Sequence, residues 1–75
     1  MLKTVRLTRG LSQSQLANRC DMPVQTLQKY ENNFANINGA RLETLLKLSI
    51  NLDCRIEDIV TDDSLKDLLY IYESR

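Results

Sequence analysis

Segment 11–33, LSQSQLANRCDMPVQTLQKYENN, constrains the fold most strongly, because it predicts two short helices joined by a tight corner. Ser12 is a suitable N-cap, and Gln15, three residues later, can complete a capping box. A helix is therefore expected to begin at Gln13. Its inward face would carry the apolar residues Leu16, Ala17 and Cys20.

Residues 20–23 predict the corner between the two helices. Pro23 fits the first turn of a helix and disfavours helix in the residue before it. In the helix that follows, Leu27 and Tyr30 can face inward together with Met22. The opposite face would then be polar and nearly free of acid, with residues spaced by four and three: Gln25, Lys29 and Asn32.

The words LSQSQLA and TLQKYEN, separated by a turn, resemble the helix-turn-helix of the phage-repressor and Cro-like family of DNA-binding regulators, also called XRE. The likeness covers roughly residues 2–60 and implies an all-α, lambda-repressor-like domain of five to six helices. Such proteins place the second motif helix, here about residues 24–32, in the DNA major groove, usually as two-fold dimers. Asp21 and Asn33 stand where the family usually has Gly, and both positions are expected to need a left-handed backbone.

The flanking segments also carry helix signals. A first helix is expected over residues 2–8, ended by Gly10 as a C-cap residue. In the loop after the motif, Phe34 and Ile37 are expected to pack against the core. Asn38 is expected to cap the next helix.

That next helix is predicted over about residues 39–52, and a brief one over 56–60. The inner face of the longer helix would carry Leu42, Leu45, Leu46 and Leu48 or Ser49. Asp62 or Asp63 begins a last helix, because acids favour a helix N-terminus. Its apolar stripe is Leu65, Leu68, Leu69 and Tyr72. We expect this stripe to meet a second subunit or the body of its own domain.

The predicted reading helix offers side chains that suit base edges. The Gln25 amide can accept from and donate to adenine, and Lys29 can reach a guanine edge or a phosphate. Val24 can touch a thymine methyl group or be an ordinary half-buried valine.

The resemblance also implies phosphate contacts. Gln13 matches a residue that contacts the DNA backbone and can brace the reading helix, and a helix N-terminus favours anions. Thr26 can bind phosphate or help seat the helix, and Asn32 can bind phosphate or end the helix. Arg41 is a generic phosphate candidate, as are Lys3 and Arg9. Arg6 and Glu31 match an ion pair of some repressors, interpreted here as structural.

The charge is unevenly distributed although the formal net charge is zero. Residues 1–41 carry six basic and two acidic side chains, a net +4, and contain the whole motif. Residues 42–75 carry four basic and eight acidic side chains, a net −4. The second half is therefore expected to point away from DNA or towards a basic partner.

The rest of the composition narrows the class of function. Seventy-five residues predict one domain over 1–75, with 62–75 as a C-terminal helical extension, and no membrane-spanning run or signal peptide. The chain has no His, no glycine-rich phosphate loop and no cluster of metal ligands, so no catalytic residue, metal or cofactor is expected. Cys20 and Cys54 are expected to be free thiols. We expect a cytoplasmic, homodimeric DNA-binding repressor and not an enzyme. The alternative is an antitoxin-like or other protein-interaction module whose acidic second half holds a partner protein.

Overall fold

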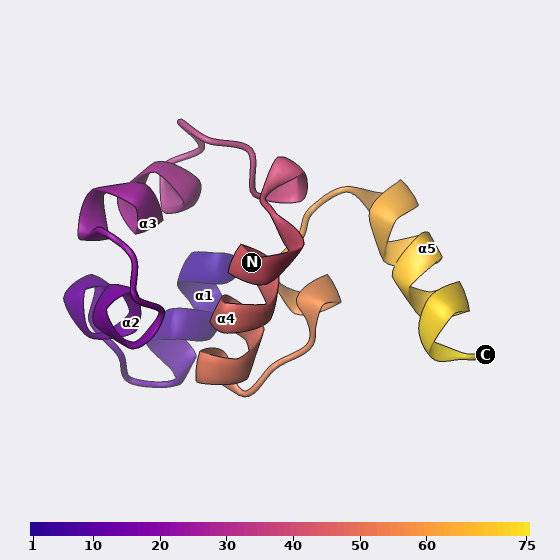
Figure 1. Ribbon diagram of the computed structural model, residues 1–75, viewed down its shortest axis with the longest axis horizontal. Coiled ribbons are helices and arrows are strands. Elements are labelled where there is room, and N and C mark those ends of the chain that lie inside the picture. Colours follow the sequence, from indigo (N-terminus) through magenta and orange to yellow (C-terminus); the bar gives the residue numbers. More distant parts are fainter.

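The computed structural model describes residues 1–75 and contains five α-helices, two short 3₁₀ helices and no strand. Helices α1 to α4 surround one core, and α5 lies to one side of it (Figure 1). The predicted all-α class is therefore confirmed. In chain order the elements are α1 (Leu2–Thr8), α2 (Gln13–Arg19), α3 (Val24–Glu31), η1 (Ile37–Gly39), α4 (Leu42–Leu52), η2 (Ile56–Asp58) and α5 (Asp63–Glu73).

Local signals set the ends of α1 and α2. Gly10 adopts a left-handed backbone with φ of 72° just after α1, where a residue with a Cβ would be strained. The capping box at α2 is formed, since the Gln15 backbone N–H donates to Ser12 Oγ at 3.0 Å and the Ser12 N–H donates to Gln15 Oε1 at 2.8 Å. Helix α1 thus has the predicted bounds, and α2 begins at the predicted residue, Gln13.

The corner of the motif has the backbone that the sequence predicts. Asp21 has φ of 53° and Asn33 has φ of 63°, so both positions where glycine was expected are left-handed. Pro23 is the N-cap of α3, and the first helical residue is Val24, one position later than the first-turn place predicted for the proline. The extended ψ of 141° at Pro23 completes the turn between the two helices.

The core lies where α2, α3 and α4 meet beneath α1. Leu16, Leu27 and Leu48 come from these three helices and have no exposed surface. Burying such a leucine contributes roughly 2–3 kcal/mol, so these contacts fix α3 relative to the other helices. The twelve buried core residues are Leu2, Leu11, Leu16, Ala17, Cys20, Leu27, Ile37, Leu45, Leu48, Leu52, Ile59 and Val60.

The prediction for the start of α4 is wrong. Asn38 does not cap this helix, and residues 37–39 form the separate turn η1. The chain is extended at Ala40 and Arg41, and α4 begins at Leu42 without a side-chain cap. The Asn38 carboxamide instead accepts from the backbone N–H groups of Thr61 and Asp62, at 2.7 and 3.0 Å.

The inner face of α4 is narrower than predicted. Leu45, Leu48 and Ser49 are buried, together with Leu52. Leu42, by contrast, is 65% exposed and lies on the outside of the helix. Leu46 and Ile50 follow at intervals of four and are also exposed, so α4 carries a second apolar stripe turned away from the core.

Phe34 does not pack against the core as expected, and 83% of its surface is exposed. The loop after α3 is a Schellman motif, in which the Phe34 N–H donates to the Lys29 carbonyl at 2.9 Å and the Asn33 N–H to the Tyr30 carbonyl at 3.4 Å. The residue at the Phe34 position of such a motif usually contacts an apolar side chain in the last turn of the helix. Here those positions are Gln28 and Lys29, so the motif supplies no apolar partner for the ring.

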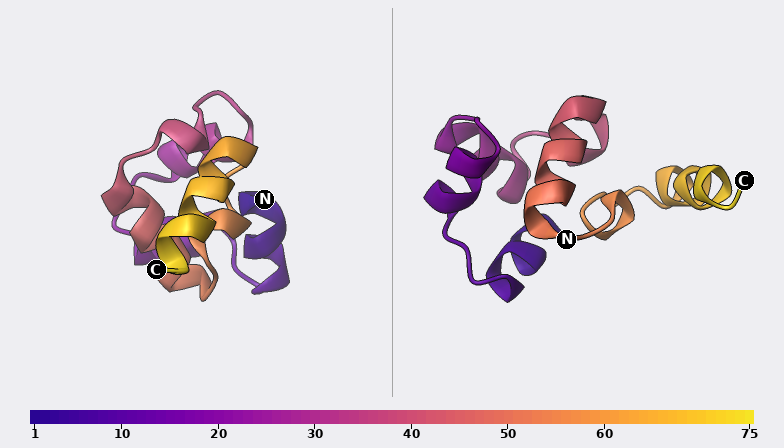
Figure 2. Two further views of the ribbon diagram at one scale, coloured as in Figure 1. Left: turned by 90° about the vertical axis from the view of Figure 1, so that its right-hand side faces the viewer. Right: turned by 60° about the horizontal axis from the view of Figure 1, so that its bottom comes forward.

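Helix α5 projects from the rest of the molecule (Figure 2). Asp62 caps it by accepting from the Ser64 N–H at 2.9 Å. Leu65 and Leu69 pack against the core cluster. The other apolar residues of this helix are exposed, namely Leu68, Tyr70, Ile71 and Tyr72. Of the predicted stripe, Leu65 and Leu69 therefore face the body of the domain, whereas Leu68 and Tyr72 face solvent.

Candidate nucleic-acid interface

Helix α3 has one buried face and one open face. Leu27 is fully buried, which anchors the helix in the core. Gln25 and Lys29, four residues apart, are exposed on the other side, and Asn32 continues the same face at the C-cap. Val24 is half-buried and packs partly against the core, as expected for a residue at the edge of this face.

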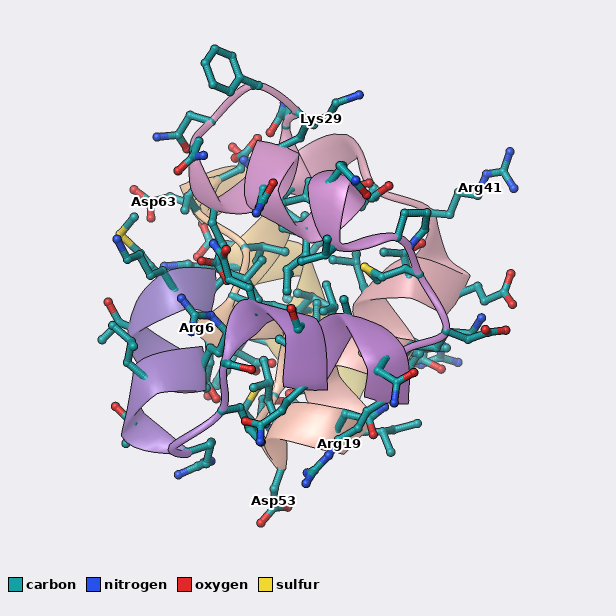
Figure 3. The ribbon with its side chains drawn as sticks, turned by 90° about the vertical axis from the view of Figure 1, so that its left-hand side faces the viewer. Arg6, Arg19, Lys29, Arg41, Asp53 and Asp63 are labelled. Atoms are coloured by element: carbon teal, nitrogen blue, oxygen red, sulfur yellow. The ribbon has the colours of Figure 1, made fainter.

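The open face of α3 carries no exposed acid. Between Met22 and Leu42 the one carboxylate is that of Glu31, and its side chain is fully buried. Lys29 extends outward from α3, and Arg41 extends outward at the start of α4, whereas Asp53 lies at the opposite edge of this view (Figure 3). The side chains of Lys29 and Arg41 form no ion pair, so both charges are available to an anionic ligand.

Arg6 and Glu31 form a bidentate ion pair inside the domain. Arg6 Nε donates to Glu31 Oε2 at 2.7 Å, and Arg6 Nη2 donates to Glu31 Oε1 at 3.0 Å. The two side chains are only 7% and 0% exposed. Arg6 also donates through Nη1 to the Leu11 carbonyl at 2.8 Å, so the guanidinium joins α1, the chain entering α2 and the end of α3.

Gln13 links the start of α2 to α3. Its Nε2 donates to Glu31 Oε1 at 3.1 Å, and its Oε1 accepts from Gln28 Nε2 at 3.3 Å. Both ends of the Gln13 amide are thus engaged with α3. This geometry favours the bracing role over direct phosphate contact for this side chain.

Among the remaining phosphate candidates, Arg9 is hydrogen-bonded within the protein. Arg9 donates to the carbonyls of Leu52 and Asp53, at 2.7 and 2.9 Å, and so completes the C-terminal end of α4. Lys3 is exposed, and Thr26 is half-buried on α3. The role of Arg9 could not be found from sequence, because its partners lie 43 and 44 residues away.

No cluster of three or more His, Cys, Asp or Glu side chains is placed to hold a metal ion. Burial raises the pKa of the Cys20 and Cys54 thiols, and both cysteines are free. The largest hollow, about 550 Å³, is an open groove between α4 and the end of α5, with walls that include Leu46, Ile50 and Glu73. No helix is long and apolar enough to cross a lipid bilayer.

Comparison with known protein families identifies the family to which this arrangement of helices belongs. A family described as Helix-turn-helix matches residues 2–59, which hold α1 to α4 and η2. No curated protein and no solved structure shows significant similarity to the chain. The matching family is one of DNA-binding regulatory domains and not of enzymes, and its fold is lambda-repressor-like and all-α. The chain therefore belongs to the Cro/repressor-like helix-turn-helix family, of XRE type, whose members are DNA-binding transcription regulators.

Proposed function

We propose that this protein is a sequence-specific repressor that reads the major groove of duplex DNA with α3. The observation that carries the proposal is the two-sided character of α3. Leu27 seats the helix in the core, while Gln25 and Lys29 stand free on the surface of the same helix. A helix of this kind fits the major groove, and binding there would block transcription by occupying the site.

Three side chains of α3 are assigned to base edges. The Gln25 amide would pair with the N6 and N7 groups of adenine. Lys29, one turn further on, would donate to a guanine edge or to a phosphate beside it. The uncovered part of Val24 would contact a thymine methyl group.

The phosphate contacts would flank this reading face. Asn32 and Arg41 are exposed on either side of the loop after α3, and Thr26 lies half-buried on α3 itself. Gln13 would act indirectly, because its amide holds Gln28 and Glu31 in place. These groups would set the orientation of α3 and add affinity without reading sequence.

We also propose that two copies associate through α5 and the outer stripe of α4. Leu68 and Ile71 on α5, and Leu46 and Ile50 on α4, are exposed apolar residues, and the two α4 residues line an open groove that reaches Glu73 at the end of α5. Such a surface is typical of a protein interface. A two-fold dimer could set two α3 helices about 34 Å apart, which matches one turn of DNA.

A second candidate is a partner protein bound on that same surface, in the manner of antitoxin-like modules. The net charge of −4 over residues 42–75 favours a basic partner. Self-association of the purified chain in sedimentation equilibrium would favour the homodimer. A chain that stays monomeric while it binds its DNA would favour the partner.

The function is tested by selecting duplexes from a random-sequence pool with the purified protein, followed by titration of the enriched duplex. We expect one recurrent motif, tighter binding to it than to a scrambled duplex, and an affinity that falls steeply with salt. Failure to enrich any motif, combined with no salt-dependent binding to either duplex, would reject DNA recognition by α3.

A further inference from the structure

The backbone of Phe34 is hydrogen-bonded to the end of the proposed reading helix. Its backbone N–H and that of Ala35 both donate to the Lys29 carbonyl, at 2.9 and 3.1 Å. Asn33, with φ of 63°, makes the left-handed turn that this arrangement needs. The backbone that carries the ring therefore has a defined place next to the last turn of α3.

The chain on either side of Phe34 is polar and carries positive charge. No residue from Asn32 to Leu42 is acidic, and the exposed cations nearest in sequence are Lys29 and Arg41. Phe34 is the most exposed of the large apolar residues, and none of its sequence neighbours from Asn32 to Asn36 is a large apolar residue that could extend a protein interface. A stable protein interface needs roughly 800 Å² on each partner, far more than one ring can supply.

We propose that the Phe34 ring packs on deoxyribose sugars of the DNA strand that borders the groove occupied by α3. This inference rests on the proposed function, because it places the ring beside the helix that enters the groove. A duplex offers apolar sugar faces between its phosphates, and Lys29 and Arg41 would pair with phosphates of the same duplex. Phe34 thus adds affinity that depends neither on base sequence nor on counterion release.

The test compares Phe34→Ala with the native chain in anisotropy titrations of two labelled duplexes, the selected one and a scrambled one. We expect the affinity of Phe34→Ala to fall by about five- to thirtyfold on both duplexes, with an unchanged slope against salt concentration. Phe34→Leu, which keeps apolar area, should recover part of the loss. Lys29→Ala should instead lower the slope by about one. The matched control is Leu7→Ala, which trims an exposed apolar residue of α1 outside the proposed interface.

A direct probe uses the absence of tryptophan from the chain. In Phe34→Trp, the emission of the single indole should change when either duplex is added at low concentration. Unchanged affinity of Phe34→Ala on both duplexes would overturn this inference alone, as would a loss that appears together with weaker self-association in sedimentation. If the native chain binds neither duplex, the proposed function itself fails.

Discussion

The carboxamide of Asn38 is hydrogen-bonded twice to Thr61. Its Oδ1 accepts from the Thr61 backbone N–H at 2.7 Å, and its Nδ2 donates to Thr61 Oγ1 at 2.9 Å. The same Oδ1 accepts from the Asp62 N–H at 3.0 Å. One side chain therefore ties the turn that follows α3 to the segment that leads into α5.

The first prediction concerns this tie. Asn38→Ala should lower the free energy of unfolding by about 1 kcal/mol, because several partly exposed hydrogen bonds are lost together. It should also increase hydrogen exchange in the first turn of α5, since Asp62 caps that helix. Asn18→Ala, at an exposed position of α2, is the control. If exchange in α5 stays the same in Asn38→Ala, the tie does not position this helix.

The second prediction concerns the pair of Arg6 and Glu31. Removing either side chain should cost about 3–5 kcal/mol of stability, because a buried charge is left without its partner. Glu31→Gln should cost less, since the amide can still accept from Arg6. Chemical denaturation of both single variants and the double variant measures the coupling. Additive losses would contradict a stabilising pair.

The third prediction concerns the reading face. Gln25→Ala should weaken binding to the selected duplex by about 1–3 kcal/mol and change binding to a scrambled duplex little, because an amide contact to adenine is specific. The readout is the ratio of the two affinities. An equal loss on both duplexes would assign Gln25 to the DNA backbone.

The fourth prediction concerns the exposed side of α5. Replacing Leu68 and Ile71 by Ser should shift sedimentation towards the monomer and lower affinity for a duplex with two half-sites, while thermal stability of the monomer is kept. Tyr70→Ser is the matched control, because Tyr70 is also exposed but lies about 160° around the helix from Leu68. A double Ser variant that associates like the native chain would place the dimer contact elsewhere.

The fifth prediction concerns the left-handed corner. Asp21→Ala should lower the melting temperature, because Ala at φ of 53° is strained by about 1 kcal/mol. Asp21→Gly should match or exceed the native chain in stability, since Gly adopts this backbone without a steric penalty. Equal melting temperatures for the two variants would mean that the corner relaxes.

Local rules explain the parts of the fold that could be predicted. The capping box of Ser12 and Gln15, the bounds of α1, the start of α2, and the left-handed backbones at Asp21 and Asn33 all depend on residues within a few positions. The same holds for the open face of α3, because the helical repeat alone separates Gln25 and Lys29 from Leu27.

The errors share one cause, which is contact with distant segments. The amide of Asn38 was expected to cap α4 but binds Thr61, 23 residues further along the chain. Leu42 was placed inside because periodicity shows which residues share a face but not how much of that face another helix covers.

The sequence by itself determined α1, the start of α2, the tight corner and the polar face of α3, because their causes are short-range backbone and capping preferences. Only the tertiary structure decided which apolar stripes remain exposed to solvent and which groups the long polar side chains bind. Packing of α5 against one side of the body covers Leu65 and Leu69 and leaves Leu68 free. Phe34 remains outside, and the two positions that its place in the Schellman motif usually contacts are Gln28 and Lys29. Burial depends on the whole arrangement of helices, and no local pattern contains that arrangement.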